Sequence, residues 1–147
     1  MATTELLDGY HRAVGSRRHL ARPVLRAGLG ATILLAGAHK LVAPGAWHAY
    51  LAPAFAALWP TGLLPLDPAF VAFGVSEVVV GALLLVDRYS SLMAAVVAVS
   101  MLGVDVNLAV AMVQGEPVAD VLVRDLGLTL WAAGVMLLEA RDGNGSG

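Results

Sequence analysis

Six ionisable side chains lie within stretches of the chain that are otherwise apolar enough to cross a lipid bilayer. They are His39, Lys40, Glu77, Asp105, Arg124 and Asp125. A charge near the centre of a bilayer costs about 2.5–3.5 kcal/mol on insertion scales. Such side chains therefore face one another, a cavity or a partner. We take these six as the candidates for ligand binding or proton relay.

Their chemistry suits a site for a small amphipathic molecule. The head group of a quinone, for example, needs donors to its carbonyl oxygens and a source of protons on reduction. Lys40, His39 and Arg124 are suitable donors, and Glu77 and Asp105 are suitable proton relays. These residue types predict a ligand pocket between helices, and they leave catalytic residues unassigned.

The same residues also allow a purely structural interpretation. Buried polar groups in membrane bundles often join one helix to another. An ion pair between Lys40 and Asp125, or between Arg124 and Glu77, would serve that purpose. The residue types alone leave the binding role and the structural role open.

The composition indicates an integral membrane protein. Only 14% of the 147 residues are charged, whereas soluble domains average about 25%. The one basic cluster, from Arg12 to Arg26, precedes an apolar stretch and is typical of an orientation signal, so no nucleic-acid partner is expected. Cysteine is absent, which excludes disulfides and cysteine-ligated iron–sulfur clusters. No metal site is predicted, and His39 has no second membrane imidazole with which to bind haem.

Four stretches are long enough to span the bilayer as helices, which takes about 20 residues each. They run from 23 to 42, 68 to 86, 90 to 113 and 118 to 138. Short connections between the last three favour antiparallel neighbours. We therefore predict an all-α membrane protein with a four-transmembrane-helix antiparallel bundle. Residues 1–21 would form a cytoplasmic N-terminal arm, 22–139 the transmembrane domain, and 140–147 a flexible C-terminal tail.

The stretch from Pro44 to Asp67 is apolar but contains four prolines, which disfavour a regular crossing. It also carries Trp47, Tyr50 and Trp59, residue types that prefer the membrane–water interface. We interpret it as a broken interfacial or re-entrant segment between spans one and two, with a fifth span as the competing interpretation.

The arginines predict the orientation of the four-span bundle. Seven of them fall on one side of the membrane: Arg12, Arg17, Arg18, Arg22, Arg26, Arg88 and Arg141. The loops of the opposite side contain neither lysine nor arginine. The positive-inside rule then places both termini in the cytoplasm, with the protein in the plasma membrane.

The rise of a helix allows the depth of each charge to be estimated. Lys40 lies about 25 Å, Glu77 about 16 Å, and Asp105 and the Arg124–Asp125 pair about 22 Å from the cytoplasmic boundary. The six candidates would therefore share one layer, from mid-membrane to the outer leaflet.

Small residues accompany these charges at helical spacing, as on the faces Gly30–Gly37–Lys40 and Gly74–Glu77–Gly81, and such faces pack closely against other helices. Three further residues are predicted as secondary polar lining: Ser100, Asn107 and Trp131.

The chain resembles the DoxX family of small four-span membrane proteins. The resemblance rests on Arg26-Ala-Gly-Leu-Gly30 and Ala36-Gly-Ala-His-Lys-Leu41 in span one. It continues with Gly74-Val-Ser-Glu77 through Gly81-Ala-Leu-Leu-Leu85 in span two and Arg124-Asp-Leu-Gly-Leu128 in span four, and it covers about residues 22–139. Family members include a subunit of a thiosulfate:quinone oxidoreductase and proteins associated with oxidative stress.

The resemblance and the residues together indicate a membrane subunit of a redox or respiratory system that binds a quinone-like or other small amphipathic ligand. It would be an accessory subunit of a quinone-linked oxidoreductase with no redox centre of its own, and whether it is itself an enzyme stays open. Its expected partners are the bilayer, a soluble redox subunit and further copies of the chain. The alternatives are a structural, assembly or anchoring subunit and, with less support, a small proton-coupled transporter.

Overall fold

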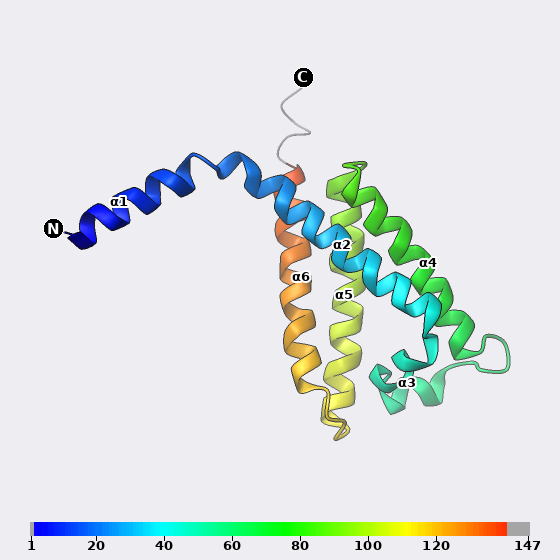
Figure 1. The fold of residues 1–147 in the computed structure, drawn as a ribbon. Helices are drawn as coiled ribbons and strands as arrows, with labels where there is room; N and C mark the ends of the chain where they lie inside the picture. Colours follow the sequence, from blue (N-terminus) through cyan, green and yellow to red (C-terminus); the bar gives the residue numbers. More distant parts are fainter. Residues whose placement is uncertain (1, 141–147) are drawn as a thin grey trace.

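The computed structural model describes residues 2–140, and within that range every regular element is a helix (Figure 1). The elements, in chain order, are α1 (Ala2–Gly15), η1 (Arg18–Leu20), α2 (Ala21–Val42), η2 (Pro44–Tyr50), α3 (Pro53–Leu58), α4 (Leu66–Leu85), α5 (Ser90–Val113) and α6 (Ala119–Ala140). The predicted all-α class is confirmed. The predicted tail lies outside the described residues, apart from Ala140, and so does Arg141.

Three of these helices, α4, α5 and α6, are long and apolar enough to cross a membrane. The fourth candidate span is α2 taken together with η2, which turns away from it by 111°. The long helices follow the four predicted spans to within two residues at each end. The chain is therefore a helical multi-pass membrane protein, and its surroundings are the lipid bilayer.

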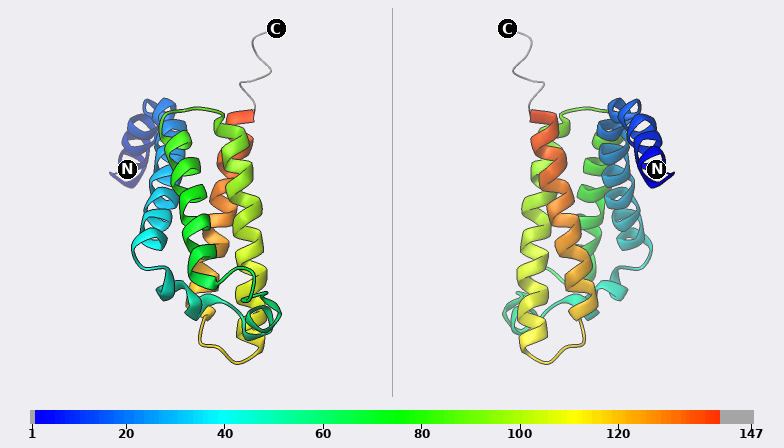
Figure 2. Two further views of the ribbon diagram at one scale, coloured as in Figure 1. Left: turned by 90° about the vertical axis from the view of Figure 1, so that its right-hand side faces the viewer. Right: turned by 90° about the vertical axis from the view of Figure 1, so that its left-hand side faces the viewer.

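The four long helices form two antiparallel pairs, α2 with α4 and α5 with α6 (Figures 1 and 2). We call the end of the bundle where α2 begins and α6 ends the terminal end, and the opposite end the loop end. The two pairs meet at the terminal end and separate toward the loop end (Figure 1). Leu29, Leu84, Val97 and Val135 fill the core where the pairs meet.

The segment between α2 and α4 occupies the loop end, in the space that the two pairs leave. Ala52 is fully buried there against Leu108 and Ala111 of α5. The Asn107 amide holds the segment, since Nδ2 donates to the Tyr50 carbonyl at 2.6 Å and Oδ1 accepts from the Ala52 N–H at 2.9 Å. Pro44 and Pro53 start two short helices instead of one span. The predicted broken segment is confirmed.

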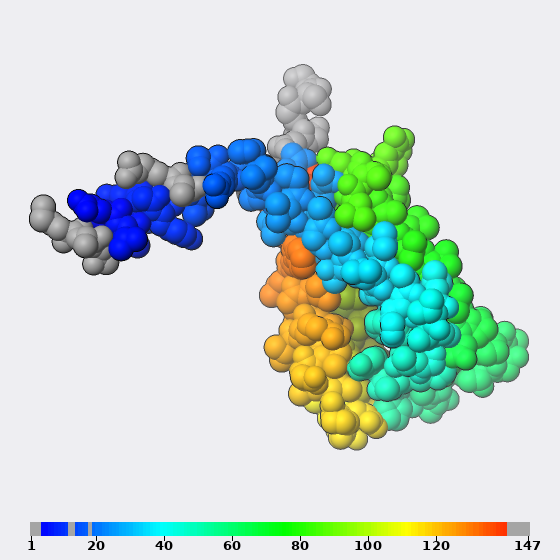
Figure 3. Space-filling view, viewed as in Figure 1, coloured from blue at the N-terminus to red at the C-terminus, as the bar shows by residue number. Residues whose placement is uncertain are grey.

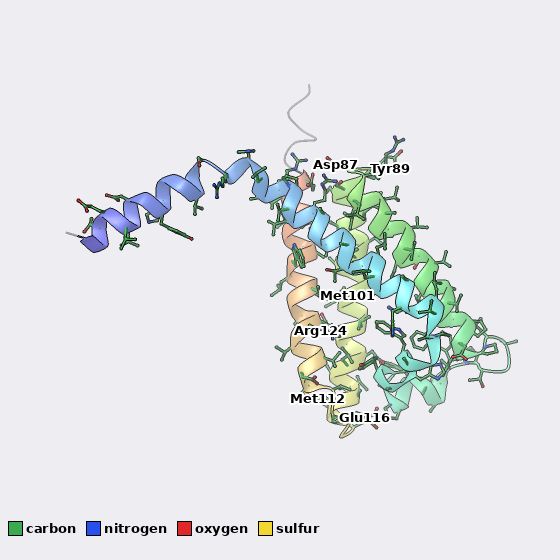
Figure 4. All side chains as sticks on the ribbon, viewed as in Figure 1. Asp87, Tyr89, Met101, Met112, Glu116 and Arg124 are labelled. Atoms are coloured by element: carbon green, nitrogen blue, oxygen red, sulfur yellow. The ribbon has the colours of Figure 1, made fainter. Side chains whose placement is uncertain are left out.

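A tight turn joins α4 to α5 at the terminal end, where Figure 4 labels two of its residues. Asp87 and Tyr89 both adopt left-handed backbone conformations, with φ of 58° and 56°. Such φ values are uncommon for residues other than glycine. The Asp87 carboxylate accepts a hydrogen bond of 2.7 Å from the Ser90 hydroxyl, which ties the turn to the first residue of α5.

Candidate ligand-binding site

Lys40 and Glu77 form a buried ion pair between α2 and α4. The Lys40 ammonium lies 2.9 Å from Oε1 and 2.7 Å from Oε2 of Glu77. The ring of Trp47 covers the same ammonium at 3.6 Å from its centroid, a cation–π contact. Only 9% of the Lys40 side chain is exposed. Each charge therefore has its partner within the protein.

Glycines on both helices make this pair possible. A Cβ atom at Gly37 would lie 2.6 Å from the Gly74 carbonyl oxygen, and one at Gly74 would lie 2.8 Å from that of Gly37. The same Cβ atoms would approach Glu77 and Lys40 to 2.8 and 2.9 Å. Small residues let the backbones come this close. The prediction that these glycine faces pack closely against other helices is confirmed, and the structure shows that the two faces contact each other.

The side chain of His39 points in a different direction from that of its neighbour Lys40. Its ring is exposed, and its Nδ1 accepts a hydrogen bond of 3.0 Å from the indole N–H of Trp47. A neutral imidazole that accepts at Nδ1 carries its proton on Nε2. Trp47 therefore leaves the Nε2–H of His39 as a donor directed away from the ion pair.

Asp105 belongs to the other helix pair. Its Oδ2 accepts a hydrogen bond of 2.6 Å from the Thr129 hydroxyl of α6, and the residue is only 4% exposed. Its second oxygen, Oδ1, is buried with no hydrogen-bond partner among the described residues. Buried oxygens usually have a partner. This oxygen therefore keeps an unused acceptor position inside the pair α5 and α6.

Arg124 and Asp125 are sequence neighbours on α6 and contact each other. The Arg124 Nε donates to Asp125 Oδ1 at 3.0 Å, which is the only hydrogen bond of this guanidinium among residues 2–140. The Arg124 side chain is 64% exposed, whereas that of Asp125 is 11% exposed. The two terminal nitrogens of the guanidinium thus keep their donors, and Figure 4 labels the residue on α6.

The structure divides the predicted layer of six residues into separate groups. Both predicted inter-span pairs, Lys40–Asp125 and Arg124–Glu77, are wrong, because Lys40 pairs with Glu77 and Arg124 pairs with Asp125. The estimate of depth used only the rise along each helix. It could not specify direction around the helix or the separation of the two pairs, and these decide which charges meet.

The secondary lining residues also fall into different places. Ser100 is exposed on α5, and its role as a lining residue stays a prediction. Asn107 holds the loop-end segment. Trp131 packs its ring against Gly28 of α2, where a Cβ would lie 2.9 Å away, and its indole N–H is buried with no partner among the described residues.

The contact between Gly28 and Trp131 identifies the sides of α2 and α6 that face each other. Helical spacing puts Thr32 and His39 on the same side of α2 as Gly28, with His39 about 16 Å further toward the loop end. It puts Arg124 on the same side of α6 as Trp131, about 10 Å further in that direction. Since the helix pairs separate along this path, His39 and Arg124 face the space between them.

Figure 3 shows that space as a hollow in the surface between α6 and the loop-end half of α2, with α5 at its floor. We call it the α2–α6 hollow. It combines apolar helix surface with two exposed donors, the His39 imidazole and the Arg124 guanidinium. The hollow opens sideways, in the direction from which a molecule dissolved in the bilayer would enter.

A second group of charges at the terminal end was not among the candidates. Glu139 of α6 accepts from Arg22 Nε at 2.8 Å and lies 3.7 Å from Arg26 Nε. Arg26 also donates to the Leu84 carbonyl of α4 at 2.6 Å and pairs with Asp87 at 3.4 Å. The sequence signal was the position of Glu139 in the last turn of span four, beside the arginines that begin span one.

The fold and the paired charges define a small polytopic helical membrane protein. The model of the DoxX family matches residues 21–112, which is more than half of the chain. The chain therefore belongs to the DoxX family. The match extends from α2 to α5 and ends before α6, which carries Arg124 and Trp131. No curated protein and no solved structure matches the chain.

Proposed function

We propose that this chain is a membrane subunit of a redox or respiratory system, and that it binds a quinone-like or other small amphipathic molecule in the α2–α6 hollow. Family membership supports the redox setting. The proposal is carried by one observation: Arg124, inside a membrane-spanning helix, is 64% exposed and retains unused donors beside the hollow. An exposed guanidinium in such a helix is costly unless it faces a polar group or a cavity.

In this proposal the head group of the ligand lies near Arg124 and His39. Both offer N–H donors suited to a carbonyl oxygen. Asp105, whose buried Oδ1 has no partner among the described residues, serves as a proton relay between α5 and α6, beneath the surface of the hollow. The apolar tail leaves through the opening toward the lipid. The chain has no cysteine, so electrons would come from a partner subunit or a bound cofactor.

The orientation that we propose places both described ends, and the arginines near them, on the cytoplasmic side of the plasma membrane. Arg17, Arg22, Arg26 and Arg88 all lie at the terminal end in this fold, which supports the positive-inside argument. We retain residues 1–21 as an arm and 22–139 as the membrane domain.

A structural or anchoring subunit is the second candidate function. It is favoured by the Lys40–Glu77 pair, whose charges are satisfied within the chain and so leave little for a ligand. In both candidate functions this pair joins two helices. Only the ligand-binding function requires that a molecule occupies the α2–α6 hollow.

The test is purification from native membranes in mild detergent, followed by mass spectrometry of the molecules that co-purify. We expect a stoichiometric quinone or similar amphiphile with the parent chain. Arg124→Gln removes a charged hydrogen bond of about 1.5–3 kcal/mol, which corresponds to a roughly tenfold to hundredfold weaker affinity.

Arg88→Gln is the matched control, because Arg88 is exposed at the terminal end, away from the hollow. It should keep the ligand. A parent chain that carries no small molecule and travels with a second polypeptide would refute the ligand proposal and support the anchoring role.

A further inference from the structure

Helix α1 stands apart from the bundle. It projects sideways from the start of α2 at the terminal end and runs across the direction of α5 and α6 (Figures 1 and 2). The space-filling view shows the same separation (Figure 3). Neither the packing of the core nor the proposed ligand site uses this helix.

One side of α1 is apolar and unpartnered. Leu6, Leu7, Tyr10 and Val14 recur at helical spacing and are 47% to 74% exposed. Glu5 projects from the opposite side, about 140° around the helix from Tyr10. A row of exposed apolar residues opposite charged ones is the pattern of a helix that lies in a membrane interface.

The position of α1 indicates that lipid covers its apolar side. The helix leads through η1 directly into α2, and the exposed Leu20 and Val24 continue the apolar surface from α1 onto that span. A helix that crosses the direction of the spans at their end lies parallel to the bilayer plane. Its apolar row is then at the depth of the lipid head groups and the first methylenes.

Charge indicates the kind of lipid. Residues 1–26 contain the acidic residues Glu5 and Asp8 and five arginines. Arg22 and Arg26 pair with Glu139 of α6, so the charge argument rests on Arg12, Arg17 and Arg18. The basic residues concentrate where α1 approaches α2. Arginine near a bilayer surface is attracted to anionic lipids. A neutral surface would gain only from the apolar row.

We propose that α1 is a surface-docking helix that lies on the bilayer through Leu6, Leu7, Tyr10 and Val14 and prefers membranes rich in anionic phospholipid. Docking would fix the height of α2 in the bilayer, because only residues 16–20 separate the two helices. The proposal does not depend on the ligand of the α2–α6 hollow.

The test uses the absence of cysteine in the full chain. Single cysteines introduced by Leu7→Cys, Tyr10→Cys and Glu5→Cys each carry an environment-sensitive fluorophore, with the protein in vesicles of phosphatidylcholine or of phosphatidylcholine with phosphatidylglycerol. We expect blue-shifted emission at positions 7 and 10, water-like emission at position 5, and a larger shift in the anionic vesicles. Arg17→Gln should reduce the difference between the two vesicle types.

Equal, water-like emission at all three positions in both vesicles would overturn the proposal. A blue shift that grows with protein density at fixed lipid composition would also overturn it, because that result identifies a protein partner such as a second copy. Circular dichroism of each labelled variant verifies that the bundle is folded, so that neither result reflects unfolding.

Discussion

Helix α2 presents two faces that meet their neighbours in different ways. Toward α4, Gly30, Gly37 and Lys40 make a continuous contact in which the backbones touch. Toward α6, Gly28 contacts the ring of Trp131 and no backbone atom, and His39 on the same side remains exposed beside the α2–α6 hollow. Lys40 on the first face finds its partner inside the bundle, whereas His39 on the second face keeps its Nε2–H donor.

This difference shows that charge in a membrane span does not by itself indicate function. Lys40 and His39 are adjacent in sequence, yet helical geometry turns one toward α4 and the other toward the hollow. Lys40 is neutralised by Glu77 and covered by Trp47, so it acts as a joint between helices. His39 and Arg124 are therefore better candidates for ligand binding than Lys40 and Glu77.

The largest expected effect comes from removing the Lys40–Glu77 ion pair, which lies on the face of α2 that contacts α4. Lys40→Met leaves the Glu77 carboxylate in the span without its partner, and loss of one member of a buried pair costs about 3–5 kcal/mol. We expect a decrease of that size in the free energy of unfolding, measured by denaturant titration in detergent micelles.

The double variant Lys40→Met, Glu77→Leu supplies the control. It removes both charges, so we expect it to recover most of the lost stability. If the single and double variants were equally unstable, an unpaired Glu77 carboxylate would not be the cause of the loss, and the ion pair would not have the role that we describe.

The glycine contact gives the next largest effect. Gly37→Ala places a methyl group 2.6 Å from the Gly74 carbonyl oxygen, so α2 and α4 must move apart. Overpacking of this kind costs about 1–3 kcal/mol. Thermal unfolding in detergent should show a lower midpoint for this variant.

Gly103→Ala is the matched control for that substitution. A Cβ at Gly103 meets nothing within 4 Å, and alanine favours a helix over glycine. We expect unchanged or slightly higher stability. A similar loss in both variants would show that alanine acts through the helix itself and not through the α2–α4 contact.

The sequence was sufficient for the helices and for the faces that pack most closely. Apolar length predicted the four long helices, prolines predicted the broken segment, and glycine spacing predicted which faces pack closely, without saying that these two faces contact each other. These features depend on local sequence and on the bilayer, which allows the backbone few alternatives. Family resemblance agreed with the match over residues 21–112.

The candidate site was less predictable, because it depends on how far the two helix pairs separate. Nothing in the sequence of α6 indicates that Trp131 contacts Gly28 while Arg124, two turns away, faces a hollow. The roles of Thr129 and Glu139 were missed for the same reason, since each acts through a residue of another helix. The position of a residue along its helix follows from the sequence, but contacts between helix pairs do not.

The smallest effect that we predict lies where the two faces of α2 join, at Trp47. Its ring covers Lys40 and its indole N–H donates to His39. Trp47→Phe keeps a ring and removes the hydrogen bond, so we expect a loss of about 0.5–1.5 kcal/mol in stability. Nitrogen NMR of the His39 imidazole should show a mixture of the two tautomers in place of the Nε2–H form.

The control is Trp59→Phe. The indole N–H of Trp59 donates to the Leu64 carbonyl, away from His39, so this variant should leave the tautomer unchanged. An unchanged tautomer in Trp47→Phe would mean that another group orients His39, and the role of Trp47 would then be limited to covering Lys40 on the face of α2 that contacts α4.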